Sequence, residues 1–316
     1  MPGLPPSVGR AAGAALAAAA LWGGMYVVSK DTFSEIPPIS LGALRLLLAG
    51  SALAIVLRAR GKLARPRGGA MPLAAIALAA TMVTQFVGTE LATASGGALL
   101  TTTTPLFLVP LGWLALRERP TRATVAGIGA GMAGVVLAVG GGIGARNPWG
   151  PALLLLSAAG WAGYTVVAAP VSRREGPLVA VTWSTLLALP MVSALALTEA
   201  DRWRAAPFTD PATLLAVAYL GLAASAGAWY LWNRGVAGLP AAAAGACFFV
   251  QPLVGGVLAW ALLGERLTPA FALGGALILV GVVLAIGTPG RPVAERRTLS
   301  AAPAARPEAS IGRERS

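Results

Sequence analysis

Residues 104–121 read TPLFLVPLGWLALRERPT, and residues 251–268 read QPLVGGVLAWALLGERLT. The two segments share a proline, a tryptophan, a Glu-Arg pair and a threonine at corresponding positions. The offset is 147 residues, the distance between Pro105 and Pro252. A repeat of this kind indicates that the chain consists of two halves with one architecture.

The correspondence extends beyond these segments. The run GVVLA occurs at 134–138 and again at 281–285, and WGGMYVV at 22–28 has a counterpart in WAGYTVV at 161–167. Chance similarity between Ala/Gly-rich helices would not reproduce the rare tryptophan, proline and Glu-Arg positions. We therefore interpret the chain as a doubled unit.

The composition places both halves in a membrane. Of the 316 residues, 56% are hydrophobic and only 11% are charged, whereas soluble domains carry about 25% charged residues. Apolar runs of about 20 residues, the length that spans a bilayer as a helix, follow one another with short gaps. We predict an all-α integral membrane protein with ten transmembrane helices, at 11–29, 39–57, 71–90, 94–116, 122–143, 149–170, 178–198, 211–232, 240–263 and 268–288.

The predicted organisation has four parts. Residues 1–10 form an N-terminal tail, 11–143 the first five-helix repeat, 149–288 the second, and 289–316 a disordered C-terminal tail. If the N-terminus is cytoplasmic, 18 Lys and Arg residues lie inside and 5 outside. This asymmetry predicts that both termini are cytoplasmic. Because five is odd, the second repeat enters the membrane inverted, as in many secondary transporters.

The doubled segments resemble the paired EamA domains of the drug/metabolite transporter superfamily. The resemblance includes LWGGMYVVSK at 21–30, LGALRLLLAG at 41–50 and LWNRGVAGLP at 231–240, and it covers essentially 11–288. It implies a ten-helix bundle with a central substrate cavity, usually for the export of small metabolites or drugs. One departure is that the seventh helix lacks an arginine corresponding to Arg45.

Several chemistries have no residues to support them. The chain has no histidine and a single cysteine, Cys247, which removes His-type zinc sites, His-based triads and internal disulfides. It has no Walker A motif and none of the motifs of an intramembrane protease. We therefore expect no enzyme activity, no metal and no cofactor. The net charge of +12 lies mainly in short loops and the C-terminal tail, so we expect no nucleic-acid partner.

Pro105 and Pro252 fall about halfway along their helices, and each is expected to break its helix near the bilayer midplane. A threonine run at 101–104 and Gln251 stand just before them. Polar groups beside freed carbonyls at mid-depth are typical of transporter substrate sites. The alternative is that the threonine hydroxyls only bond back to their own helix.

Arg45 lies within the second helix, where a charge is costly and needs a partner. We expect it to pair with Glu90 or to anchor a carboxylate substrate; the alternative is that it reaches the outer interface. Glu90 is also the candidate proton site. Without proton coupling, the protein would be a facilitator or an exchanger.

Aromatic residues on the same helices could stack on flat or cationic substrates, with interfacial belts as the alternative. The predicted substrate-binding residues are Trp22, Tyr26, Arg45, Gln85, Thr101, Thr104, Trp161, Tyr164, Tyr230 and Gln251. The predicted structural hairpin residues, which cap or pair at tight turns, are Glu118, Arg119, Glu265 and Arg266.

These features predict a secondary transporter that exports small metabolites, such as amino acids, nucleobase-like or drug-like compounds. Its partners are a small-molecule substrate and the lipid bilayer, and the Arg-rich, Lys-poor composition favours a bacterial plasma membrane. A channel-like or lipid-moving protein is the alternative. The oligomeric state stays open, with a homodimer as the assembly considered.

Overall fold

The structure is a computed structural model that describes residues 6–61, 66, 69–92, 94–139, 147–203, 207–263 and 268–287. All regular secondary structure in these ranges is helical. Nine helical stretches are long and apolar enough to cross a membrane, and Arg122–Ala138 is a shorter apolar helix. The chain is therefore an all-α membrane protein, as the sequence predicts.

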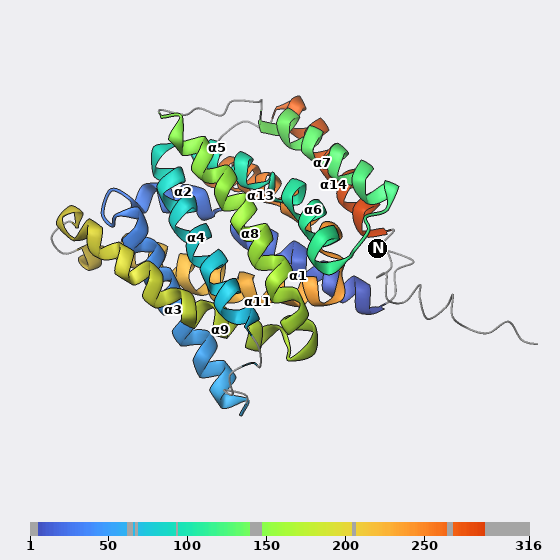
Figure 1. The fold of residues 1–316 in the computed structure, drawn as a ribbon. Coiled ribbons are helices and arrows are strands. Elements are labelled where there is room, and N and C mark those ends of the chain that lie inside the picture. The colour runs from blue at the N-terminus through green and yellow to red at the C-terminus, as the bar shows by residue number, and fades with distance from the viewer. Residues whose placement is uncertain are drawn as a thin grey trace, which may run out of the picture.

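The first half contains seven labelled helices (Figure 1). They are α1 (Pro6–Trp22), α2 (Met25–Thr32), α3 (Pro38–Ala59), α4 (Ala70–Leu91), α5 (Ala94–Thr101), α6 (Thr104–Leu116) and α7 (Arg122–Val139). Because α1 begins at Pro6, it includes residues that the sequence assigned to the N-terminal tail. The predicted C-terminal tail, 289–316, lies outside the described residues.

The second half contains longer helices and several short irregular ones. They are α8 (Trp149–Arg174), α9 (Pro177–Ala196), η1 (Leu197–Arg202), η2 (Pro207–Thr209), α10 (Pro211–Ala218), η3 (Tyr219–Gly227), α11 (Ala228–Gly238), α12 (Ala241–Ala246), η4 (Cys247–Phe249), α13 (Val250–Leu263) and α14 (Pro269–Gly287). Most are 3-10 or α-helices, but η3 is a π-helix. A π turn widens the helix and is common at functional sites.

Three predicted spans are interrupted rather than continuous. The first divides between α1 and α2 at Gly23 and Gly24. A Cβ atom at Gly23 would lie 2.7 Å from the Val254 side chain, so the break lets the chain pass close to α13. The other two interruptions, before Pro105 and Pro252, belong to the candidate site.

The last apolar helices of the two halves, α7 and α14, pack against each other at one edge of the bundle (Figure 1). A Cβ atom at Gly127 would lie 2.5 Å from the carbonyl oxygen of Gly281, and one at Gly134 would lie 2.6 Å from that of Gly274. These glycines correspond across the repeat, since 127 matches 274 and 134 matches 281. Small residues allow such close packing of membrane helices, and here the contact is reciprocal.

The remaining helices exchange partners between the halves. α4, the third membrane span of the first half, packs along α8, the first span of the second half. Reciprocally, α11 packs along α1, and α3 packs against α9. The exchange places the centre of the bundle at the contact between the two halves, while large apolar side chains such as Leu114 and Leu215 cover the outside.

Candidate functional site

A small buried cavity lies where helices of both halves meet. Its volume is about 20 Å³, which is room for about one water molecule. Among the described residues that line it, none carries a carboxylate. The lining residues are Trp22, Met25, Tyr26, Arg45, Thr81, Met82, Gln85, Thr101, Thr104, Ser157, Ala158, Trp161, Trp229, Phe248 and Gln251.

Most of the predicted substrate-binding residues meet at this cavity, but Tyr164 and Tyr230 do not. Tyr164 is buried and its hydroxyl accepts a hydrogen bond from Nδ2 of Asn233 at 2.7 Å. Tyr230 is partly buried and packs against the hydrophobic core. Neither tyrosine is therefore among the predicted residues that the structure brings together at this cavity.

Arg45 on α3 is fully buried and is held at one end of its guanidinium. Its Nε donates to the carbonyl oxygen of Leu220 at 3.2 Å and to Oγ of Ser225 at 2.9 Å. Both acceptors belong to the π-helical η3, where Oγ of Ser225 also donates to the Leu220 carbonyl at 2.6 Å. The π-helix η3 therefore holds Nε of Arg45 in a fixed position.

The other two nitrogens of the Arg45 guanidinium, Nη1 and Nη2, are not held in this way. Within the described ranges, neither Nη1 nor Nη2 has a hydrogen-bond partner. The Cζ atom lies 4.9 Å from the ring centroid of Phe86 and 5.9 Å from that of Trp229. These cation–π contacts offset part of the cost of burying the charge and leave the four Nη hydrogens unused.

The predicted ion pair between Arg45 and Glu90 is not formed. Glu90, at the end of α4, pairs instead with Arg202 of η1, and Arg202 also contacts Glu199 at 3.4 Å. Glu90 is partly exposed, with 27% of its side chain accessible, so it reaches the rim of the bundle rather than the cavity. The sequence placed both residues at similar depth but could not show which way each helix is rotated.

Tyr26 links three helices beside the cavity. Its hydroxyl donates to Oγ1 of Thr101 at 2.6 Å and accepts from Nε2 of Gln85 at 2.9 Å. Thr101 in turn donates to the carbonyl oxygen of Gly97 at 2.9 Å. The Thr101 hydroxyl therefore donates a hydrogen bond to its own helix and also accepts one from Tyr26 of α2.

Aromatic rings also line this cavity. The ring centroids of Trp22 and Trp161 are 5.3 Å apart at an interplanar angle of 86°, and Trp22 stacks on Phe248 at 5.3 Å and 27°. In the part of the chain that the structure describes, Nε1 of Trp161 and Oε1 of Gln251 are buried without a hydrogen-bond partner. Such atoms are costly to bury unsatisfied and are available to a ligand.

Several polar residues of the site lie at or next to helix interruptions. α5 ends at Thr101 and α6 begins at Thr104, with Pro105 in its first turn. In the second half, α12 is followed by the 3-10 turn η4, and Pro252 lies in the first turn of α13. Each proline thus follows a break, and the breaks lie at corresponding places in the two halves.

The first predicted hairpin contains Glu118 and Arg119, and its carboxylate contacts the second half of the chain. Glu118 is buried, accepts a hydrogen bond from the backbone nitrogen of Ala241 at 2.7 Å, and pairs with Arg173 at 2.7 Å. Arg119 is exposed. The second hairpin, Glu265 and Arg266, lies outside the described residues.

The sequence interpretation missed Ser157, which lines the cavity, and Leu220 and Ser225, which hold Arg45. Ser157 lies one helical turn before Trp161 on α8, and that spacing could have identified it. Leu220 and Ser225 gave no signal, because nothing in an Ala/Gly-rich run marks a π-helix. Their role depends on the helix against which they pack.

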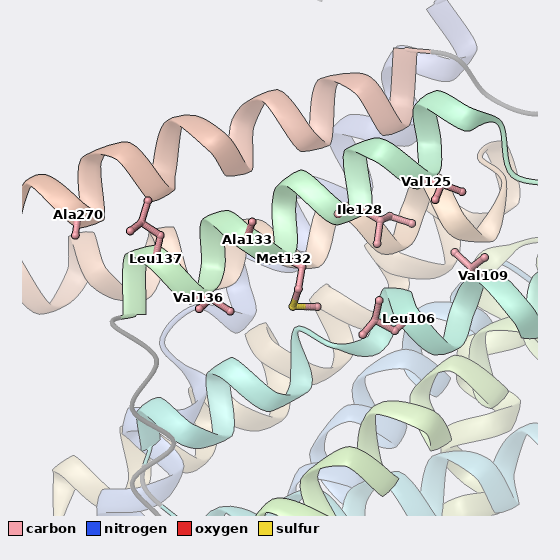
Figure 2. A pocket seen from close by; sticks show the side chains of 10 residues that line it. Leu106, Val109, Val125, Ile128, Met132, Ala133, Val136, Leu137 and Ala270 are labelled. Carbon is pink, nitrogen blue, oxygen red and sulfur yellow. The ribbon is translucent and has the colours of Figure 1, made fainter.

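A second, larger hollow is an apolar groove of about 1030 Å³ between α6 and α7. Figure 2 shows Met132 of α7 pointing toward Leu106 of α6. Only apolar side chains and a glycine line it, and such a surface on a membrane protein fits lipid tails. It offers no group that would orient a polar metabolite, so the central cavity is the better candidate site.

The EamA-like transporter family matches this chain twice, over residues 9–140 and 148–287. The uncharacterized transporter YwfM of Bacillus subtilis (strain 168) is 28% identical over 281 residues, covering 87% of this chain and 93% of the relative. A probable terminal-alkyne amino-acid exporter of Streptantibioticus cattleyicolor is 32% identical over 249 residues, covering 76% and 81% of the two chains. The inner membrane transporter YedA of Escherichia coli (strain K12) is 28% identical over 278 residues, covering 86% and 89%.

One solved crystal structure superposes with a TM-score of 0.73 at 22% identity, covering 92% of this chain and 99% of its own. This similarity shows a shared fold. The family matches cover most of the chain, and the relatives are named as transporters. The protein is thus a multi-pass transporter of a bacterial membrane, not an enzyme, and it belongs to the EamA-like transporter family.

Proposed function

We propose that this transporter exports small metabolites across the plasma membrane by alternating access to the central cavity. One observation carries the proposal: a buried polar cavity lies at corresponding helix breaks, at the contact between two repeated halves. Transporters with repeated halves place their substrate at such breaks. A cavity of about 20 Å³ holds no metabolite until the surrounding helices separate.

Side-chain contacts close the bundle on both sides of this cavity. At one end, Glu118 joins α6 to Arg173 and to the start of α12. At the opposite end, Lys30 Nζ donates to the carbonyl oxygen of Glu90 at 2.6 Å, and Glu90 pairs with Arg202. Alternating access then consists of opening one set of contacts while the other stays closed. The positive-inside asymmetry supports placing the Glu118 end, and both termini, in the cytoplasm.

The range of substrates includes amino acids, nucleobase-like and drug-like compounds. The name of the relative from Streptantibioticus cattleyicolor, an amino-acid exporter, supports the first of these. Among the described residues that line the cavity none is a carboxylate, which favours transport without proton coupling through an acid at the site. We therefore expect a facilitator or an exchanger.

The test compares metabolites in the medium of cells that express wild type, Gln251→Ala or Ser51→Ala. Gln251 lines the cavity, whereas Ser51 is exposed on the outer surface of α3. A compound enriched outside by wild type and Ser51→Ala, but not by Gln251→Ala, supports export through the central cavity. Equal enrichment by all three proteins would place the pathway elsewhere.

A lipid-moving activity is the second candidate, and the apolar groove beside α7 favours it. Proteoliposomes separate the two functions. Saturable counterflow of a water-soluble compound supports a transporter with alternating access, whereas a channel gives flux without counterflow. Movement of labelled lipid between leaflets without any counterflow would favour the second candidate.

A further inference from the structure

The central cavity contains a buried cation whose binding face is unused. Arg45 carries five N–H donors, and among the residues that the structure describes only the donor on Nε has a hydrogen-bond partner. We propose that the exported substrate is an organic carboxylate, and that its carboxylate oxygens bind Nη1 and Nη2 of Arg45. This inference rests on the proposed transport function and names the substrate class.

The orientation of Arg45 suits this role. The carbonyl of Leu220 and the hydroxyl of Ser225 hold Nε, which fixes one edge of the guanidinium where Arg45 lines the cavity. A planar guanidinium presents parallel N–H groups that match a carboxylate in two hydrogen bonds. Preorganisation of this kind raises affinity, because less side-chain freedom is lost on binding.

The charge balance also requires an anion. An arginine stays protonated in proteins, and burying a charge without a partner is unfavourable. The carboxylates of Glu118, Glu90 and Glu199 pair with other cations, Arg173 and Arg202, and Arg45 forms no ion pair within the described ranges. The rings of Phe86 and Trp229 compensate only in part, so the occluded site lacks one negative charge.

The rest of the lining favours an organic anion over an inorganic one. Rings of Trp22, Trp161 and Phe248 form an apolar wall close to the guanidinium cavity. Nε1 of Trp161 offers an unused donor and Oε1 of Gln251 an unused acceptor. A carboxylate attached to a flat apolar body, with a further N–H group, matches these features.

The test measures binding of matched pairs to the purified full-length protein in lipid nanodiscs. Each pair differs only in the charge of one group: indole-3-acetate and indole-3-acetamide, phenylacetate and phenylacetamide, L-tryptophan and L-tryptophanamide, and butyrate and butyramide. We expect at least one carboxylate to bind about 10- to 100-fold more tightly than its amide, the range typical of a charged hydrogen bond. Chloride and phosphate at equal concentration should not compete.

Three variants assign the effect to Arg45. Arg45→Gln should remove the preference for the carboxylate, and Arg45→Lys should retain part of it, because lysine keeps the charge but not the planar fork. Arg58→Gln changes an exposed arginine on the same helix and should leave the preference intact. If Arg45→Gln does not fold, Trp161→Phe and the wild-type pairs still decide. Trp161→Phe should weaken the binding of carboxylates that use the N–H donor of Trp161, but these carboxylates should still bind more tightly than their amides.

Clear outcomes would overturn the inference. Equal binding of amides and carboxylates across the panel, or an unchanged preference in Arg45→Gln, removes Arg45 as a carboxylate anchor. Competition by chloride or phosphate makes the site one for small inorganic anions. If wild type exports neutral or cationic compounds instead, the substrate class is wrong while transport stands; if no compound shows export or counterflow, the transport proposal itself fails.

Discussion

Glu118 and Arg173 form an ion pair of 2.7 Å between the two halves of the transporter. Arg173 also donates to the carbonyl oxygens of Val236 and Leu239 at 3.3 Å each, at the end of α11. The same Glu118 carboxylate accepts from the first residue of α12, Ala241. One carboxylate of the first half therefore holds three segments of the second half together.

Loss of this charge should favour the state that is open at the Glu118 end. In Glu118→Gln the ion pair is gone, although the amide oxygen can still accept from Ala241. We expect a shift of about 1 kcal/mol, since the pair is partly exposed, which is roughly a fivefold change in population. Cys247, the single cysteine of the chain and fully buried beside Phe248, reports the opening through its rate of labelling by a water-soluble maleimide.

The matched control for this experiment is Glu175→Gln, which changes an exposed carboxylate just beyond α8. It should label at the wild-type rate. Unchanged labelling in Glu118→Gln would show that the contact is not a closure and only packs the hairpin.

The crossing of α7 and α14 should tolerate no added methyl group. A Cβ atom at Gly127 would lie 2.5 Å from the carbonyl oxygen of Gly281 and 2.8 Å from the nitrogen of Ala285. Because both neighbours are backbone atoms, Gly127→Ala should destabilise the protein by about 1–3 kcal/mol through overpacking. Thermal unfolding in detergent measures the effect.

Gly129→Ala provides the control on the same helix, because no atom lies within 4 Å of a Cβ at Gly129. Its melting temperature should equal or exceed that of wild type, since alanine favours a helix over glycine by about 1 kcal/mol. Equal losses in both variants would mean that glycine flexibility, rather than the close contact, determines stability.

The carboxylate of Glu199 caps the beginning of α3. It accepts hydrogen bonds from the backbone nitrogens of Ile39 at 3.2 Å and Ser40 at 2.8 Å, and from Oγ of Ser40 at 3.0 Å. Glu199→Ala should lower the free energy of unfolding by about 1–2 kcal/mol, as for other lost caps. Glu199→Gln, which keeps an acceptor oxygen, should recover much of this, and Asp201→Ala at an exposed neighbour should have little effect.

Asp210 should make the stability of α10 depend on pH. Hydrogen bonds from the backbone nitrogens of Thr213 and Ala212 lower its pKa from the ordinary value of 3.8. Because the folded pKa is the lower one, the stabilisation is complete above the ordinary pKa and is lost as the pH falls through the folded pKa. The difference in melting temperature between wild type and Asp210→Ala should stay constant near neutral pH and shrink in acid.

Asp210→Asn is the informative comparison, because asparagine also caps helices but does not titrate. The difference between Asn and Ala variants should not change with pH. A difference that shrinks in acid for both comparisons would indicate titration of another group.

Local patterns in the sequence were enough to predict the apolar helices, the doubling of the halves and the two proline-associated breaks. The physical reason is local: in lipid, a backbone must satisfy its own hydrogen bonds, so apolar length predicts helices directly. The same reasoning singled out Arg45, because a charge within a span is too costly to be incidental.

Which side chains meet depends on how the helices pack. Arg45 bonds to Leu220 and Ser225 rather than Glu90, and Trp161 lines the cavity while Tyr164, about one turn later, bonds to Asn233. Apolar helices in a membrane have no polar face to indicate their rotation. Rotation is set by close contacts between distant helices, such as those of the glycines in α7 and α14, and these contacts exist only once the halves have packed.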